Sequence, residues 1–492
     1  MSQRHLAVVI LAAGQGTRMK SAKPKVMHNL AGLPLLGHAL ATASSLNAAH
    51  VIPVVRHQKD ELVDYIAAHY PQATVVEQDE IPGTGRAVEC ALQALPADFD
   101  GAVVVTSGDV PLLDVATIET MIEVHLEAGT AATVLTTFLD DPNGYGRVLR
   151  ATDGEFIEIV EQRDATKSQL EIDEVNAGVY VFDVKPLRQA LAKVGSHNAQ
   201  GEKYLTDAAS VLLEDGHNVQ AISVGDEWLV AGINDRAQLS EVAAELNARI
   251  CNAWQLAGVT ILDPYTTWID VTVSIGAETT ILPGTYLHGL TQIGEGATIG
   301  PEVVMTDCLV GDGATVIKAH ATSSSIGDGA SVGPFAYLRP GTQLGTDAKI
   351  GTFVETKNAV IGDGSKVPHL SYVGDAEIGV GSNIGAGTIF ANYDGVNKHR
   401  STIGNQVRTG SHNVFVAPIS IGDGAYTAAG TVVRRNVEPG ALGMNVAPQR
   451  NLADWVLQKR EGSKAAEAAK AAQAADKGQN KSSEPSSENT SE

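Results

Sequence analysis

Aliphatic side chains recur at every sixth position over much of the second half of the chain. Two uninterrupted runs show this spacing, and they are Ile275, Ile281, Leu287, Ile293, Ile299 and Ile326, Val332, Leu338, Leu344, Ile350. A glycine usually follows the aliphatic residue, as in the sequence Ile-Gly-Asp-Gly-Ala at 326–330. The spacing matches neither the 3.6-residue period of a helix nor the two-residue period of a strand. It predicts a left-handed parallel β-helix, in which each hexad forms one flat side of a coil and points its aliphatic residue inward.

The first half alternates short β-branched stretches with helical patterns. The predicted strands cover 6–12, 50–55, 73–77, 102–106 and 132–137, and the predicted helices cover 33–46, 59–69, 85–95 and 114–128. This alternation predicts a Rossmann-like α/β domain with a mostly parallel sheet and helices on both faces. Two further predicted strand regions, 148–160 and 177–182, have no helix between them, which favours a mixed edge or a lid.

These patterns predict an α/β + all-β chain with four segments. Residues 1–236 form the nucleotide-binding domain, 237–257 a helical linker, and 258–450 the hexapeptide-repeat domain. The last segment, 451–492, has an Ala/Lys/Glu/Ser/Gln-rich composition and is predicted to be disordered, or at most weakly helical, from about residue 462.

The hexad spacing is interrupted in three places. These are residues 318–325, 351–360 and 391–402, and the last of them is a polar stretch. Insertions in a solenoid form loops on its outside, often on the binding side. The sequence therefore predicts that function is concentrated near these interruptions.

Charge and composition narrow the classes of function. The chain carries 35 Lys and Arg against 57 Asp and Glu, a net charge of −22, which disfavours binding to nucleic acid or anionic membranes. The apolar stretch 6–13 is too short to span a bilayer. Cys90, Cys251 and Cys308 lie far apart, so neither a disulfide framework nor a zinc site is indicated. These features predict a reduced, cytoplasmic protein.

A glycine-containing segment, 11–19 (LAAGQGTRM), follows the first predicted strand directly. Gly14 would let the backbone approach an anion, and Arg18 and Lys25 add positive charge at the same end of the sheet. The segment has neither the third glycine of the dinucleotide fingerprint nor the Gly-Lys-Ser/Thr of a P-loop. On its own it is equally consistent with a simple strand-to-helix turn.

A set of segments in order resembles the sugar-phosphate nucleotidyltransferases. They are 11–19, 23–25, Gln78, 83–85, 107–112, 145–147, 161–162, 176–180 and 232–234. Joined to hexapeptide repeats, they resemble the bifunctional N-acetylglucosamine-1-phosphate uridylyltransferase/glucosamine-1-phosphate acetyltransferase family over roughly residues 6–450. The resemblance implies acetylation of glucosamine-1-phosphate by acetyl-CoA and then transfer of UMP from UTP. The product, UDP-N-acetylglucosamine, would serve bacterial peptidoglycan synthesis.

The resemblance also implies the residues of the uridylyl site. Positions matching contacts to UTP or UDP-N-acetylglucosamine are Leu11, Ala12, Ala13, Gly14, Lys25, Gln78, Gly83, Thr84, Ser107, Gly108, Asp109, Gly146, Glu161, Asn176 and Asn234. Arg18 and Lys25 would stabilise the triphosphate and the charge that develops during transfer. Asp109 and Asn234 would offer oxygen ligands to Mg²⁺, with phosphate and water completing the shell.

For acetyl transfer the candidate general base is His369, because imidazole titrates near neutral pH, and Glu355 is a candidate partner that fixes its tautomer. The resemblance implies that Arg339, Lys357, Tyr372 and Asn383 bind glucosamine-1-phosphate, and that Ala386, Asn392, Tyr393, Ser411 and Ala429 bind acetyl-CoA. Sites of this type lie between subunits, so a homotrimer is expected.

Two points stay open at this stage. Val446 stands where some family members carry an arginine, so a cationic contact to CoA would come from Arg434, Arg435 or Arg450, or be absent. Trp455 either anchors the last helix or covers a neighbouring active site. The alternative to two activities is a single nucleotidyltransferase whose β-helix only oligomerises.

Overall fold

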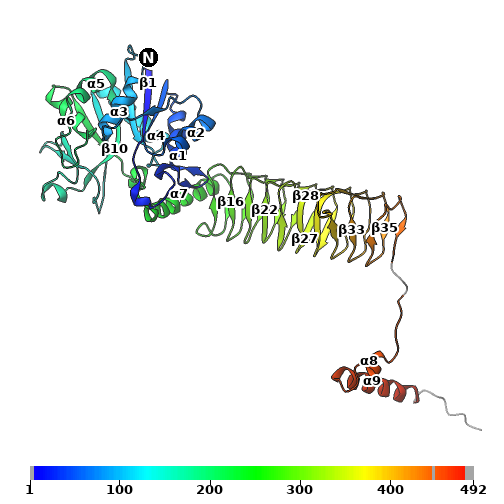
Figure 1. Cartoon of the computed structure of the whole chain (residues 1–492). Helices are drawn as coiled ribbons and strands as arrows, with labels where there is room; N and C mark the ends of the chain where they lie inside the picture. The colour runs from blue at the N-terminus through cyan, green and yellow to red at the C-terminus, as the bar shows by residue number, and fades with distance from the viewer. Residues whose placement is uncertain (1–4, 446–448, 482–492) are drawn as a thin grey trace, which may run out of the picture.

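A nine-stranded sheet forms the centre of the first half. The computed structural model describes residues 5–445 and 449–481, and Figure 1 shows a sheet domain joined to a long stack of coils. The strand order is β11-β7-β10-β6-β1-β4-β5, with β8 and β9 attached beside β10. The strands are β1 (His5–Ala12), β4 (His50–Val55), β5 (Val76–Glu77), β6 (Gly101–Ser107), β7 (Ala132–Phe138), β8 (Arg147–Arg150), β9 (Phe156–Val160), β10 (Glu174–Asp183) and β11 (Val219–Ser223), and a separate hairpin joins β2 (Asn29–Leu30) to β3 (Leu33–Pro34).

The centre of this sheet is parallel, as the strand–helix alternation predicts. β1 pairs in parallel with β4 and β6, whereas β10 runs antiparallel to β6 and β7 and gives the sheet its mixed part. The helices are α1 (Leu35–Ser45), α2 (Lys59–His69), α3 (Thr84–Gln93), α4 (Val115–Ala128), α5 (Val184–Lys193) and α6 (Thr206–Glu214), with 3₁₀ turns η1 (Thr17–Met19), η2 (Lys25–Met27), η3 (Gln169–Glu171) and η4 (Glu227–Val230).

Alternate residues of β1 enter two separate hydrophobic cores. Val9 packs with Val88 and Leu187 on one face of the sheet, and Ile10 packs with Leu40 and Met121 on the other. A parallel strand that is buried on both faces needs a continuous apolar sequence. This requirement explains the run Ala7–Ile10 and places the loop after β1 at the carboxyl edge of the sheet, where ligands bind in such folds.

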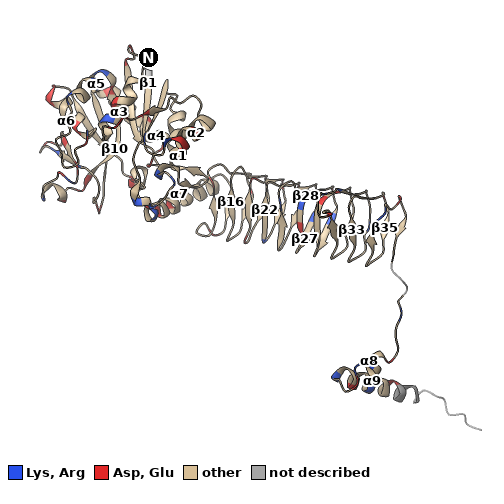
Figure 2. Cartoon of the chain, viewed as in Figure 1, with Lys and Arg blue, Asp and Glu red and all other residues tan. Residues whose placement is uncertain are grey.

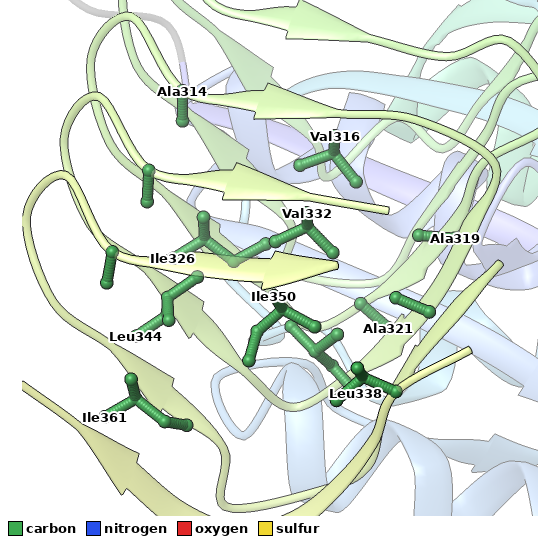
Figure 3. Packing of buried hydrophobic residues seen from close by; sticks show 14 of the residues in the cluster. Ala314, Val316, Ala319, Ala321, Ile326, Val332, Leu338, Leu344, Ile350 and Ile361 are labelled. Carbon is green, nitrogen blue, oxygen red and sulfur yellow. The ribbon is translucent and has the colours of Figure 1, made fainter. Parts of the chain in front are cut away.

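The second half is a parallel β-helix, as the hexads predict. Ile275 pairs with Ile293, and Ile281 pairs with Ile299, so each coil is three hexads long. The aliphatic residues point into the coil, where Figure 3 shows Ile326, Leu344 and Ile361 among the stacked side chains.

The coil strands form two large sheets. The first contains β12 (Thr260–Ile261), β15 (Thr280–Ile281), β18 (Thr298–Ile299), β21 (Thr315–Val316), β24 (Ser331–Val332), β27 (Lys349–Thr352) and β29 (Lys366–His369), and β35 (Tyr426–Thr427) pairs with β37 (Leu442–Gly443) farther on. The second contains β13 (Trp268–Ile269), β14 (Ser274–Ile275), β16 (Tyr286–His288), β17 (Gln292–Ile293), β19 (Val304–Thr306), β20 (Leu309–Val310), β22 (Ala319–Thr322), β23 (Ser325–Ile326), β25 (Ala336–Leu338), β26 (Gln343–Leu344), β28 (Glu355–Ile361), β30 (Tyr372–Ile378), β31 (Ile389–Ala391), β32 (Ser401–Ile403), β33 (Val414–Val416), β34 (Ile419–Ile421) and β36 (Val432–Val433).

The three interruptions of the hexad spacing differ in kind: the prediction of an outside loop is wrong for the first two and confirmed for the third. Residues 318–325 contain β22 and 351–360 contain part of β28, so both stretches remain in the coil. The register there is shortened, because Thr315 pairs with Ser331 only 16 positions on. The third interruption is an insertion, since Glu377 pairs with Thr402, 25 positions on, and residues 393–398 form an exposed loop.

The predicted linker corresponds to α7 (Arg236–Leu256), which begins at the capping carboxylate of Asp235. At the other end of the chain, α8 (Trp455–Lys459) packs against α9 (Lys464–Lys481). Disorder was predicted from about residue 462, but the structure has α9 there. The alanine-rich sequence of α9 has a high intrinsic helix propensity, which explains the difference. Residues 482–492 lie outside the described residues.

Two predictions from composition can be compared with the structure. Cys90, Cys251 and Cys308 are free and buried. Within the described part of the chain, no helix is both long and apolar enough to cross a membrane.

Candidate functional sites

The first candidate site is a cleft of about 390 Å³ at the carboxyl edge of the sheet. Its lining includes ten residues predicted for the nucleotide site, namely Leu11, Ala12, Ala13, Gly14, Lys25, Gln78, Gly83, Thr84, Ser107 and Asp109. Arg56, His57 and Glu202 also line the cleft and were not predicted from the sequence. The segments that the resemblance placed together therefore meet in space, although they span nearly a hundred positions.

Gly16 brings the loop after β1 against Lys25. Its φ is +64°, in the left-handed region, and a Cβ there would lie 2.5 Å from the Lys25 Cβ. Gly14 has no atom within 4 Å of its added Cβ, so its backbone faces open space in the cleft. Gly16 therefore allows the loop to pack against Lys25, and Gly14 leaves the backbone accessible from the cleft.

Lys25 joins the two residues predicted as metal ligands. Its Nζ donates to Asp109 Oδ2, and it also donates to Asn234 Oδ1 at a distance of 3.2 Å. Ser107 Oγ donates to the other oxygen of Asp109, and the Ile233 amide donates to the Asp109 carbonyl. Two side-chain oxygens thus converge on one cationic position, which Lys25 fills here.

The turn at Gly83 is held by a segment that the sequence did not single out. Gln78 is buried and donates to the carbonyls of Ile81 and Gly83, at 2.9 and 3.1 Å. Gly83 has φ +116°, and a Cβ there would collide with the backbone of Lys203. Lys203 also forms an ion pair with Glu89 of α3 at 2.5 Å. The segment around Lys203 thus fixes one wall of the cleft.

Gly146, Glu161 and Asn176 form a second group in the same domain. The Asn176 amide donates to the Gly146 carbonyl, and Glu161 accepts from Thr206 Oγ1 at 3.3 Å. Burial raises the pKa of Glu161. Arg18 lies exposed on η1 and is not part of the cleft lining.

On the β-helix, the predicted phosphate-binding residues lie on neighbouring coils. Arg339 follows β25, Lys357 lies on β28, and Arg339 Nη1 donates to Glu355 Oε1 at 2.9 Å. Lys398, from the inserted loop, lies close enough to Lys357 to lower the pKa of Lys357 through a side-chain hydrogen bond and charge repulsion. Lys398 was not predicted, and its place in a polar insertion was the only signal for it. Figure 2 shows charged segments gathered at β28.

His369 ends β29, and its side chain is exposed. Its carbonyl accepts from Ser371 Oγ at 2.7 Å, but its imidazole makes no hydrogen bond within residues 5–445 and 449–481. The structure differs here from the predicted His369–Glu355 pair, because Glu355 is paired with Arg339. An adjacent arginine on the coil is the stronger partner for a carboxylate.

Tyr372 and Asn392 lie on either side of a small gap. A Cβ on Gly374 would meet both Tyr372 Oη and Asn392 Nδ2, so only glycine leaves room for them. Asn392 and Asn358 both donate to Asp375. Burial alone would raise the pKa of Asp375, but these two hydrogen bonds and the nearby charges of Lys357 and Lys398 lower it overall.

The remaining acetyl-CoA positions form a column down the coils. The His412 backbone amide donates to the Ala386 carbonyl at 2.7 Å, and the Gly430 backbone amide donates to the Ser411 carbonyl at 2.8 Å. Ala429, which precedes Gly430, therefore lies on the coil next to Ser411. Asn383 bridges in parallel to Arg408, and Tyr393 is exposed at the start of the loop. Val446 lies outside the described residues, and Arg434, Arg435 and Arg450 are exposed.

Known proteins resemble this chain over nearly its whole length, so the similarity includes both candidate sites. Residues 8–202 match the model of the MobA-like NTP transferase domain. The chain is 60% identical over 464 residues to the bifunctional protein GlmU of Clavibacter sepedonicus, covering 94% of each chain. It is 57% identical to the GlmU proteins of Kineococcus radiotolerans and Mycobacterium tuberculosis, again over 94% of each chain.

The chain belongs to the GlmU family. It is a bifunctional enzyme that combines a uridylyltransferase with an acetyltransferase. Both halves of the GlmU chain lie within the similarity, so the alternative of a β-helix that only oligomerises is set aside.

Proposed function

We propose that the cleft at the edge of the sheet transfers UMP from UTP to N-acetylglucosamine-1-phosphate. A phosphate oxygen of the sugar would attack the α-phosphorus while the bond to pyrophosphate breaks. Such a reaction demands positioning and neutralisation of charge more than covalent chemistry. The observation that carries the proposal is the meeting of the loop after β1, Lys25 and Asp109 around one cleft.

Asp109 and Asn234 would hold Mg²⁺. Their oxygens already converge on one cation, the Lys25 ammonium, so the donor set fits a hard divalent ion. Mg²⁺ usually takes one or two carboxylates and fills its shell with phosphate and water, and it supplies neutralisation of the phosphates. Lys25 would then turn toward the triphosphate.

Gly146, Glu161 and Asn176 would hold the amino sugar. The backbone hydrogen bond from Asn176 to Gly146 and the Glu161 carboxyl beside Gly146 support this role, because a sugar hydroxyl can donate to such a carboxylate. Arg56 faces the same cleft as Lys25 and would add a second cation along the phosphates.

We propose that the β-helix acetylates glucosamine-1-phosphate. His369 would accept a proton as the amine attacks the thioester of acetyl-CoA, so that a C–N bond forms, the C–S bond breaks and the thiolate is protonated. Arg339, Lys357 and Lys398 would bind the phosphate, a role supported by three cations around one outer surface of the coils. Tyr372 and Asn383 would contact the sugar, and the column at Ala386 would receive acetyl-CoA.

A homotrimer would complete this second site. His369 and Lys398 lie exposed on the outside of the coils, where a neighbouring β-helix can cover them. Three exposed apolar side chains, Phe335, Phe353 and Leu370, stand beside His369 at one corner and would pack against that neighbour. The free buried thiols support a reducing, cytoplasmic location.

Two single substitutions test the assignment of two sites. His369→Ala should lower acetyl transfer by about 10²–10⁴-fold, the usual contribution of a general base, and leave uridylyl transfer unchanged. Asp109→Asn should lower uridylyl transfer by about 10²-fold or more and leave acetyl transfer unchanged. Both half-reactions are measured separately on the purified full chain.

Matched variants control for the substitutions themselves. His320→Ala removes another exposed histidine of the β-helix, and Asp98→Asn removes an exposed carboxylate near the opposite end of β6. Both should retain both activities. Loss of both activities in a folded His369→Ala or Asp109→Asn protein would refute two separate sites.

A further inference from the structure

A second cleft lies where the two halves of the chain meet. It has a volume of about 500 Å³ and lies between α7, η4 and the first coil. Its lining consists of Trp228, Glu241, Ala244, Glu245, Asn247, Ala248, Pro264, Tyr265 and Trp268. None of these residues lines the first cleft or belongs to the residues assigned to the β-helix site.

The walls of this cleft are fixed to one another. Asn247 of α7 is buried and donates to the Thr267 carbonyl at 2.7 Å, while its own oxygen accepts from the Ile269 amide. The corner that presents Tyr265 is held by Asp263, which accepts from the Tyr265 amide and from Thr266 Oγ1. A preformed cleft costs little ordering entropy when a ligand binds.

Aromatic rings and carboxylates share the lining. Trp228, Tyr265 and Trp268 offer three ring systems, and Tyr265 is 91% exposed, so its ring is free to cover a ligand. Glu241 has no ion-pair or hydrogen-bond partner among the described residues. The Oε1 atom of Glu245 accepts from Arg249, and its other oxygen is available.

We propose that this cleft binds a small organic cation. The ammonium would lie between Glu241 and the aromatic rings, and the apolar body of the ligand would lie against Trp228 and Trp268. Cations are attracted to the faces of such rings, and most of all to tryptophan. A neutral apolar ligand would gain the ring contacts but would leave the Glu241 carboxylate without a counterion.

The cleft adjoins the uridylyl site through the chain. Trp228 lies in η4, and the same segment continues to Asn234, whose amide donates to Gln238 Oε1 in the first turn of α7. A ligand that contacts both η4 and α7 therefore touches the two elements that position Asn234. Occupancy should change the KM for UTP and leave acetyl transfer unaltered, an expectation that also rests on the proposed uridylyl site.

The binding itself is tested with 2-phenylethylamine, which is cationic at neutral pH, and with its neutral counterpart 2-phenylethanol. Isothermal titration of the full chain should show binding of the amine at least about fivefold tighter than that of the alcohol. The titration is run with saturating N-acetylglucosamine-1-phosphate, so that the amine cannot enter the acetyl-transfer site. Two of the four tryptophans line the cleft, and quenching of their fluorescence gives a second readout.

Three variants locate the binding. Glu241→Gln and Tyr265→Ala should each weaken the amine about fivefold or more, and both residues are exposed, so the fold should persist. Glu123→Gln makes the same change on an exposed position of α4 and should have no effect. Equal affinity for amine and alcohol, absent binding, or a Glu241→Gln protein that binds normally would each overturn the proposal. Binding without an effect on KM would leave the cleft assigned and remove only its link to uridylyl transfer.

Discussion

The proposed uridylyl cleft and the proposed acetyl-transfer surface of the β-helix are built in opposite ways. The first is concave and enclosed by loops at one edge of a single sheet, with Lys25 and Asp109 facing inward. The second lies on the outer faces of stacked coils, where His369 is exposed and has no side-chain partner in the described chain. A doubly wound sheet supplies a crevice by itself, whereas a stack of coils supplies only a surface. This contrast supports the proposal that the second site is completed by a neighbouring molecule.

The charges differ as clearly as the shapes. In the cleft, the Lys25 ammonium is already neutralised by the Asp109 carboxylate and also donates to the Asn234 side-chain oxygen, so this ion pair is balanced before substrate arrives. On the coils, Lys357 and Lys398 repel each other, and Arg339 is neutralised by Glu355. In the cleft, Mg²⁺ could therefore replace the Lys25 ammonium at Asp109 and Asn234. On the coils, the two lysine charges favour binding of a phosphate anion.

Breaking the proposed trimer should separate the two activities most strongly. Phe335 and Phe353 stack at 5.5 Å between ring centroids on one corner and are 54% and 58% exposed, so Phe335→Asp with Phe353→Asp should prevent association. Acetyl transfer should fall by about 100-fold or more, as for loss of a catalytic group, while uridylyl transfer stays within about twofold. Light scattering with size-exclusion chromatography reports the mass, and both half-reactions are assayed.

Leu309→Asp serves as the control, because this exposed residue lies on β20, away from that corner. It should leave the mass and both activities unchanged. A monomeric double variant with full acetyl transfer would show that one coil stack is sufficient.

Two glycines of the uridylyl cleft should respond differently to a methyl group. Gly83→Ala meets the backbone of Lys203 at a φ of +116°, and should cost about 2 kcal/mol or more in free energy of unfolding. Gly14→Ala meets nothing within 4 Å, so stability should change by less than about 0.5 kcal/mol. Its methyl group enters the cleft, and the KM for UTP should rise about tenfold. Thermal unfolding and kinetics check both changes, and a destabilised Gly14→Ala protein would contradict the assigned roles.

The sequence predicted those parts of the molecule that depend on periodicity. The hexads predicted the core of the coils, and the strand–helix alternation predicted the parallel centre of the sheet. Both patterns directly reflect which side chains are buried. The apolar run of β1 and the stacking of Ile275 on Ile293 are examples. The polar insertion at 391–402 was predicted, but the shortened coil at 318–325 was not, since a shortened coil and an insertion both break the spacing.

Contacts between distant segments were harder to predict from residues alone. Lys203 and Lys398 reach their sites through folding of loops, and neither lies in a periodic pattern. The Glu355 prediction was incorrect for a related reason. The sequence offers Glu355 as a candidate carboxylate for His369, but it does not show that Arg339 binds this carboxylate.

The crowding of cations on the coils should appear in the pH dependence of binding. Lys398 lowers the pKa of Lys357 below its ordinary 10.5, and only the protonated lysine binds phosphate well. Affinity for glucosamine-1-phosphate should therefore fall on the alkaline side before an ordinary lysine would titrate. Lys398→Met should weaken binding about tenfold at neutral pH and move the alkaline midpoint upward. Titration calorimetry from neutral to alkaline pH measures this affinity for both proteins. A midpoint that does not move in Lys398→Met would mean that the two ammonium groups do not interact.

The smallest effect is expected for Glu355→Gln. The Arg339–Glu355 pair is partly exposed, and such pairs contribute about 0–1 kcal/mol to stability, so the melting temperature should barely change. Because Glu355 contacts Arg339 rather than His369, its loss should leave the pH profile of kcat for acetyl transfer unchanged. Arg339, freed from its carboxylate, should bind the substrate phosphate slightly more tightly and lower KM by less than about threefold. A shifted pH profile with a large fall in kcat would instead mean that Glu355 orients His369 once the neighbouring subunit covers the site.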